Sequence, residues 1–72
     1  MSETLRVLGD RIRQERKSQW TQEEFAAKSG IDRSYYGTIE RGQQNISFLT
    51  LCKICAHLGC DVAKLTHDLP VD

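Results

Sequence analysis

Two groups of side chains in this 72-residue sequence have types and spacings that could support chemistry. The first is a set of thiols and imidazoles near the C-terminus: Cys52, Cys55, His57, Cys60 and His67. Zinc prefers such ligands, but structural zinc sites normally join two separated pairs of them, and only one C-x-x-C pair is present. We therefore expect no metal and no cofactor. A thiol or metal sensor would require these cysteines to be exposed.

The second group lies on residues 33–41, where helical spacing separates two faces. One face carries Tyr36, Ile39 and Glu40. The opposite face has a guanidinium at each end, hydroxyls between them, and a glycine that costs about 1 kcal/mol relative to alanine. Its residues are Ser34, Gly37, Thr38 and Arg41, with Arg33 and Tyr35 near the rim. An ordinary solvated face is the alternative, but a missing side chain leaves room for a close approach. The major groove of DNA admits one α-helix and offers acceptors to arginine.

Five helices are expected to position these groups, at about 4–17, 22–29, 33–41, 48–58 and 62–67. In the first, Leu5, Leu8 and Ile12 recur at three and four residues and form one apolar stripe. Each of the other four begins with a polar cap that has an apolar residue before it and another four residues after it. These caps are Thr21, Asp32, Ser47 and Asp61. Gly30 and Gly59 fit as left-handed C-caps. No run alternates apolar and polar residues for long, so the predicted fold class is all-α.

The second and third helices have a recognisable arrangement. Thr21 and Glu24 form a capping box, and Trp20 can fold over Phe25 as a hydrophobic staple. A helix of about eight residues, a three-residue turn that begins with Gly30, and a helix of about nine residues is the layout of a DNA-binding helix-turn-helix.

Composition limits the alternatives. Hydrophobic residues at 39% and charged residues at 28% are typical of a globular domain, and a single domain is expected over residues 1–72. The formal net charge is zero, which argues against indiscriminate binding to nucleic acid. No apolar run approaches the roughly 20 residues of a membrane span, and no secretory leader is recognised, so a cytoplasmic location is expected. Pro70 is expected to end the ordered part.

The segments "TQEEFAAKSGI", "YYGTIERG" and "SFLTLCKICAHLG" resemble the phage repressor and Cro-type helix-turn-helix family. The resemblance runs from about Leu8 to Leu65 and implies a five-helix, lambda-repressor-like DNA-binding domain of bacterial or phage origin, located at the nucleoid. Its helix-turn-helix would span about 21–41. The stretch "GIDRSYYGTIERGQQNIS" is most similar to the small controller proteins of restriction–modification genes, and single-domain phage repressors are nearly as similar.

The resemblance also implies roles for individual residues. Base contacts fall on Arg33, Ser34 and Thr38, with Tyr35 at the edge of the groove. Gln22 matches the position that holds a phosphate, and Arg41, Gln43, Gln44 and Asn45 match the loop that follows the DNA backbone. Arg33 is the residue expected to reach guanine through its forked guanidinium, and a salt bridge with Asp32 or Glu24 is its alternative. Arg16 matches the arginine that pairs with Glu40, although Gln19 stands where the family usually has a glycine. The three cysteines match apolar core positions.

The remaining expectation is a homodimer. The core stripe of the fourth helix leaves Leu49 outside it, where most family members carry a polar residue. Phe48, Val62 and Leu65 extend the predicted interface, within a dimerisation region at about 47–69.

The expected function is that of a non-enzymatic transcriptional regulator. It would bind a near-palindromic site in double-stranded DNA as a homodimer, without contact to a membrane. The alternatives are an antitoxin-type module that sequesters a partner protein and, less favoured, the thiol or metal sensor.

Overall fold

The computed structural model describes residues 2–72, and this range contains five α-helices. They are α1 (Glu3–Lys17), α2 (Gln22–Ser29), α3 (Arg33–Glu40), α4 (Phe48–Leu58) and α5 (Val62–Thr66). The predicted all-α class is confirmed for the described residues, and no helix end differs from its predicted position by more than one residue. None of the helices in this range is long and apolar enough to cross a membrane.

Local capping explains why the helices begin where they do. Each predicted cap accepts a hydrogen bond from the backbone N–H three residues further on. The residues concerned are Thr21, Asp32, Ser47 and Asp61, and Ser2 does the same for α1. Thr21 and Glu24 complete the predicted capping box. Gly30 and Gly59 end α2 and α4 in the left-handed conformation, with φ of 68° and 79°. These predictions are confirmed.

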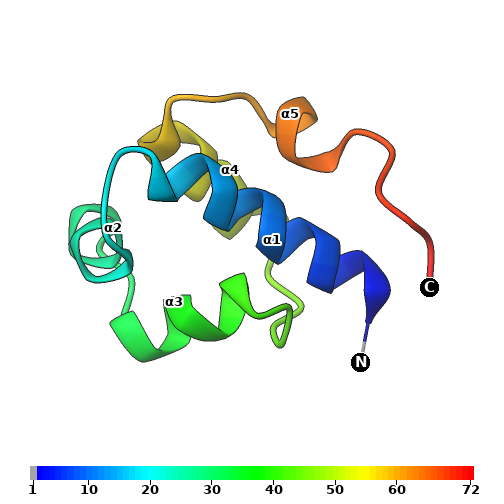
Figure 1. The fold of residues 1–72 in the computed structure, drawn as a ribbon, viewed down its shortest axis with the longest axis horizontal. Helices are drawn as coiled ribbons and strands as arrows, with labels where there is room; N and C mark the ends of the chain where they lie inside the picture. The colour runs from blue at the N-terminus through cyan, green and yellow to red at the C-terminus, as the bar shows by residue number, and fades with distance from the viewer. Residues whose placement is uncertain (1) are drawn as a thin grey trace.

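The helices pack around a single apolar core. α1 runs across the molecule and contacts α2, α3 and α5, while α2 packs on α3 and α4 (Figure 1). The buried apolar side chains are Leu8, Ile12, Phe25, Ala26, Tyr36, Ile39, Leu51, Ile54, Cys55, Leu58 and Leu65. Every helix contributes to this cluster, so α3 is held by the same core that holds α4 and α5.

The chain beyond α5 returns to the start of α1, and the two ends lie close together (Figure 1). Asp68 makes the reversal with a φ of 51°. The Asp72 carboxylate then accepts hydrogen bonds from the hydroxyl of Ser2 and the backbone N–H of Thr4, and the Thr4 hydroxyl donates to the carbonyl of Pro70. The expectation that Pro70 ends the ordered part is therefore wrong, because the residues after it cap α1.

Candidate nucleic-acid interface

The α2 and α3 helices form a helix-turn-helix whose second helix lies at the edge of the molecule (Figure 1). Aromatic rings hold the pair together. The ring centroids of Phe25 and Tyr36 are 5.3 Å apart, and those of Trp20 and Phe25 are 5.6 Å apart. The predicted staple between Trp20 and Phe25 is thereby confirmed. The large apolar contact fixes α3 against α2.

The two faces of α3 are divided largely as the helical spacing predicts. Tyr36, Ile39 and Glu40 are buried. Arg33, Ser34 and Tyr35 are exposed, and Thr38 is half-buried. The Thr38 hydroxyl donates to the Tyr35 carbonyl at 2.6 Å, so its oxygen remains available as an acceptor. Three of the four predicted base-contact side chains are therefore exposed, and the fourth, Thr38, is partly covered.

A buried ion pair anchors α3 from beneath. The Arg16 guanidinium grips the Glu40 carboxylate with two hydrogen bonds, Nη2 to Oε1 at 2.8 Å and Nε to Oε2 at 3.0 Å. A third bond joins Arg16 Nη1 to the Trp20 carbonyl at 3.1 Å, directly before α2. Only 2% of the Glu40 side chain is exposed, so this pair is held out of water. The pairing implied by the resemblance is confirmed, even though Gln19 replaces the usual glycine.

The surroundings of Glu40 keep it charged. Burial pushes its pKa upward, but the hydrogen bonds from Arg16 and Gln22 oppose burial, and the pKa lies below its ordinary value. The neighbouring Tyr36 hydroxyl is buried without a hydrogen-bond partner among the described residues. Burial, followed by the adjacent Glu40 charge, raises the pKa of that hydroxyl. An anionic Glu40 and a neutral Tyr36 therefore lie under the outward face of α3.

Gln22 occupies the first position of α2 and is partly committed to this network. Its Nε2 donates to Glu40 Oε1 at 3.1 Å. The N-terminus of α2 is also a less favourable site for an anion than the sequence suggests. Thr21 and Glu24 satisfy each other's backbone N–H groups, and the Glu23 carboxylate extends into solvent beside them. One hydrogen of the Gln22 amide remains for a phosphate, so its predicted backbone contact stays a prediction.

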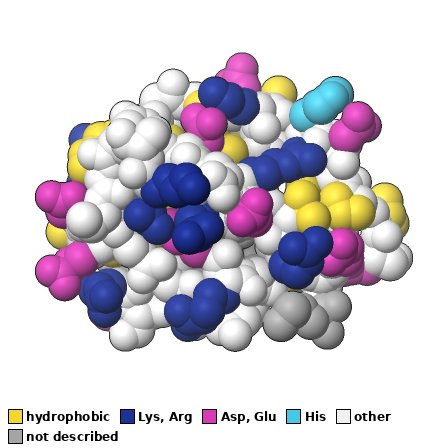
Figure 2. Space-filling view, in the orientation of Figure 1, with side chains coloured by type: hydrophobic (Ala, Val, Ile, Leu, Met, Phe, Trp, Pro, Cys, Tyr) yellow, Lys and Arg dark blue, Asp and Glu magenta, His cyan; other side chains and the backbone are white. Residues whose placement is uncertain are grey.

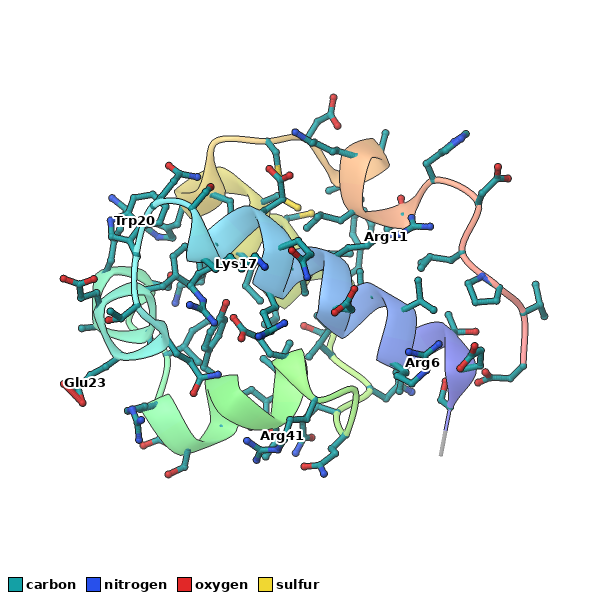
Figure 3. The ribbon with its side chains drawn as sticks, viewed as in Figure 1. Arg6, Arg11, Lys17, Trp20, Glu23 and Arg41 are labelled. Atoms are coloured by element: carbon teal, nitrogen blue, oxygen red, sulfur yellow. The ribbon has the colours of Figure 1, made fainter. Side chains whose placement is uncertain are left out.

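The Arg33 guanidinium pairs with a residue that sequence reasoning missed. Its Nε lies 3.6 Å from Glu23 Oε2, and both side chains are largely exposed. The sequence offers Asp32 and Glu24 as partners, but both carboxylates cap a helix instead. No local spacing rule links the first turn of α2 to the first turn of α3. Figure 3 shows Glu23 pointing outward from α2.

The predicted backbone loop begins directly after α3. Arg41 is exposed and points away from the core (Figure 3), and its Nε donates to Gln43 Oε1 at 3.3 Å. Gln43 and Asn45 are exposed and Gln44 is half-buried. Gly42 turns the chain with a φ of 74°. These side chains continue the polar edge of α3 toward α4.

The expectation for Gly37 needs correction. It lies on the outward side of α3 but is buried, not open to solvent. A Cβ built on Gly37 would lie 3.2 Å from Arg41 Nη1 and 3.4 Å from Gln22 Oε1. Two polar side chains from α2 and from the end of α3 therefore cover the position.

Charge is spread unevenly over this side of the molecule. Figure 2 shows Lys and Arg side chains over α1 and along the edge formed by α3, with acidic side chains between them. Arg6, Lys17 and Arg41 belong to this set (Figure 3). The formal net charge of the chain is zero, so these basic side chains are balanced by acidic ones elsewhere in the molecule.

The α4 helix carries the other unusual surface, which is apolar. Phe48 is 66% exposed and Leu49 is 79% exposed. Val62 is half-buried against the core. Leu65 is only 1% exposed and belongs to the core of the monomer, so its prediction as an interface residue is wrong. The first turn of α4 therefore presents two adjacent, largely exposed apolar side chains.

The three cysteines differ in burial. Cys55 is buried and Cys60 packs against the core, as the family positions imply. Burial raises the pKa of the Cys55 thiol to about 11. Cys52 is half-exposed and is not part of the core cluster, which corrects its predicted placement. Among residues 2–72 no group of three or more Cys, His, Asp and Glu side chains is arranged to hold a metal ion.

Comparison with known proteins agrees with this geometry. A model of the helix-turn-helix family matches residues 12–65. The control protein C.MunI of a Mycoplasma species is 43% identical over 53 residues, which cover 74% of this chain and 72% of that protein.

Solved structures agree as well. The restriction–modification controller protein C.AhdI from Aeromonas hydrophila superposes with a TM-score of 0.80 at 39% identity, over 85% of this chain and 94% of that one. The controller protein C.Esp1396I, solved as a tetramer with its natural 35-base-pair operator, superposes with a TM-score of 0.82 at 30% identity. That match covers 96% of this chain and 92% of the other. The family model covers most of the sequence, and the chain therefore belongs to the helix-turn-helix family.

Proposed function

We propose that the chain is a sequence-specific DNA-binding transcriptional regulator of the restriction–modification controller kind, acting as a homodimer on a near-palindromic operator. The observation that carries the proposal is the division of α3. Its inner face is anchored by the Arg16–Glu40 pair, and its outer face presents Arg33, Ser34 and Tyr35 to solvent. A rigidly held polar helix face is what groove readout requires, because base contacts depend on fixed donor and acceptor positions.

The contacts divide into two classes. Arg33, Ser34, Thr38 and Tyr35 read base edges, with the Arg33 guanidinium leaving Glu23 to form two hydrogen bonds with one guanine. Gln22, Arg41, Gln43, Gln44 and Asn45 contact the DNA backbone. Backbone contacts set the register of α3 in the groove, and base contacts select the sequence.

A homodimer supplies the specificity that one helix lacks. One α3 contacts only a few base pairs, and two-fold pairing places two such helices about 34 Å apart, which is one turn of DNA. Phe48 and Leu49 are exposed on α4 without a partner in the monomer, and Val62 lies at the start of α5. We assign the dimer interface to these three residues, with Leu49 near its centre. Such a regulator works at the nucleoid in the cytoplasm and catalyses no reaction.

Selection of bound duplexes from a random DNA pool tests the proposal. We expect enrichment of a near-palindrome whose half-sites are one helical turn apart. Affinity for the selected duplex should fall with salt at a slope of about −0.9 per neutralised phosphate. A pool from which no sequence is enriched would remove the proposal and favour an antitoxin-type role, in which the apolar patch on α4 binds a different protein.

A further inference from the structure

Gly37 is unlike the other four glycines because the fold does not require it. Gly30, Gly42 and Gly59 have φ between 68° and 79°, where other residues are strained. Gly9 lies against the end of α3, where a Cβ would be 2.6 Å from two backbone carbonyl oxygens. Gly37 has an ordinary helical backbone, and no backbone atom is among the three nearest neighbours of a Cβ placed there.

What lies over Gly37 is the far end of two flexible side chains. Arg41 Nη1 is 3.2 Å from a Cβ at this position, and Gln22 Oε1 is 3.4 Å from it. Arg41 is four residues further along, and side chains lean toward the start of a helix, so its guanidinium lies back over Gly37. The Arg41 Nε also donates to Gln43 Oε1 at 3.3 Å, which is a second contact that restrains the guanidinium.

A glycine within a helix is destabilising relative to alanine. Neither backbone conformation nor backbone packing offsets that cost at Gly37, and the two side chains over it could shift by a few tenths of an ångström. The observed positions of the Arg41 and Gln22 side chains therefore depend on the absence of a side chain at Gly37. Gln22 is also held by its hydrogen bond to the buried Glu40, so a side chain at position 37 would displace the Arg41 guanidinium more readily than Gln22.

We infer that Gly37 is a positioning residue. Because it has no side chain, the Arg41 guanidinium can lie over it, across the outward face of α3, directed at a phosphate of the DNA backbone. The space over Gly37 that the guanidinium occupies is called its seat below. The inference rests on the proposed function. A phosphate is the ligand because Arg41 lies beyond the base-contact end of α3, at the start of the loop that continues to Gln43. The forked guanidinium also matches two phosphate oxygens.

The test measures folding and binding of the same variants. Gly37→Ala should raise the melting temperature, by up to about 4–8 °C, because the helix gains propensity. The same variant should bind the duplex selected by the wild-type chain about three- to tenfold more weakly. Affinity for a shuffled duplex of equal length should fall by a similar factor, because phosphate contacts are sequence-independent.

A double-mutant cycle identifies the route of the effect. Arg41→Ala should weaken both duplexes and reduce the salt slope by about one. In the Arg41→Ala background, Gly37→Ala should have no further effect on affinity, since the seat would be empty. If the loss of affinity persisted in that background, the DNA itself would occupy the space over Gly37. The inference that Gly37 positions Arg41 would then be wrong.

Two further outcomes overturn the inference. Unchanged affinity of Gly37→Ala would show that Arg41 needs no seat, and a lower melting temperature would show that the fold does require the glycine. Failure of the wild-type chain to select any duplex would instead remove the proposed function, and is thereby distinguishable from failure of this inference.

Discussion

The surface of α3 and the first turn of α4 both present side chains that a lone domain does not need, but they are supported differently. The inner face of α3 carries an ion pair with two hydrogen bonds from Arg16 to Glu40, and a third bond from Arg16 reaches the Trp20 carbonyl before α2. The inner face of α4 carries only apolar side chains and the Cys55 thiol. Directional contacts require a helix that cannot rotate, whereas apolar burial is non-directional and tolerates small displacements. The contacts beneath α3 therefore fix its orientation, whereas those beneath α4 need only keep its apolar surface in place.

The largest effect should come from the support of α3. Glu40→Gln leaves the buried Arg16 guanidinium without its counter-charge, and removing one partner of a buried pair costs about 3–5 kcal/mol. Urea unfolding followed by circular dichroism measures it. Glu3→Gln is the matched control, because its pair with Arg6 at 2.7 Å is more than half exposed on both side chains, and exposed pairs contribute little to stability. Equal losses in the two variants would contradict a special role for the buried pair.

The dependence of the unfolding free energy on pH under acidic conditions should also reflect the Arg16–Glu40 pair. The folded pKa of Glu40 is lowered, so its stabilisation is complete above the ordinary glutamate pKa of about 4.3 and disappears as pH falls through the folded value. The difference in unfolding free energy between the wild type and Glu40→Gln should therefore narrow below about pH 4. A difference that stayed constant down to pH 2 would mean that Glu40 is not titrating in this range.

Next in size is the predicted effect on α4. Leu49→Asp should give a monomer with unchanged helical content, and it should weaken operator binding at least about 100-fold because each α3 then binds alone. Sedimentation and mobility shift measure the two properties, with Leu49→Met as a control that keeps the apolar area. If Leu49→Asp sediments as an intact dimer, Leu49 is not in the interface. A wild-type chain that remains monomeric at high concentration removes the dimer altogether.

A smaller effect is expected on the outward face of α3. Arg33→Ala should cost about 1–3 kcal/mol at the selected duplex and relax the preference at one position per half-site. Gln22→Ala should weaken selected and shuffled duplexes alike. An unchanged ratio of specific to non-specific affinity in Arg33→Ala would mean that Arg33 does not read a base.

The smallest effect on DNA affinity should come from the thiols of α4. Cys55→Ala should lower stability modestly and leave operator affinity unchanged, because Cys55 lies in the core. A thiol reagent at pH 8 should modify the half-exposed Cys52 before Cys55, whose buried thiol has a pKa of about 11. About one zinc per purified chain would contradict this assignment and revive a sensor role.

Most of the local structure followed from the sequence, because its causes are local. A cap such as Thr21 or Asp61 acts on an N–H group three residues away, so its effect can be predicted without knowing the rest of the fold. The same holds for the division of α3 into two faces, since helical periodicity alone separates Tyr36 from Ser34. These features predicted the five helices and the outward position of the base-contact residues.

Tertiary structure decided what covers each position. Leu65 is apolar and near the half-buried Val62, but only packing against α1 and α4 shows that it belongs to the core. Gly37 is on an outward face, yet Gln22 and Arg41 cover it. Burial and pairing are set by side chains that meet across elements, and a one-dimensional pattern carries no distance between them.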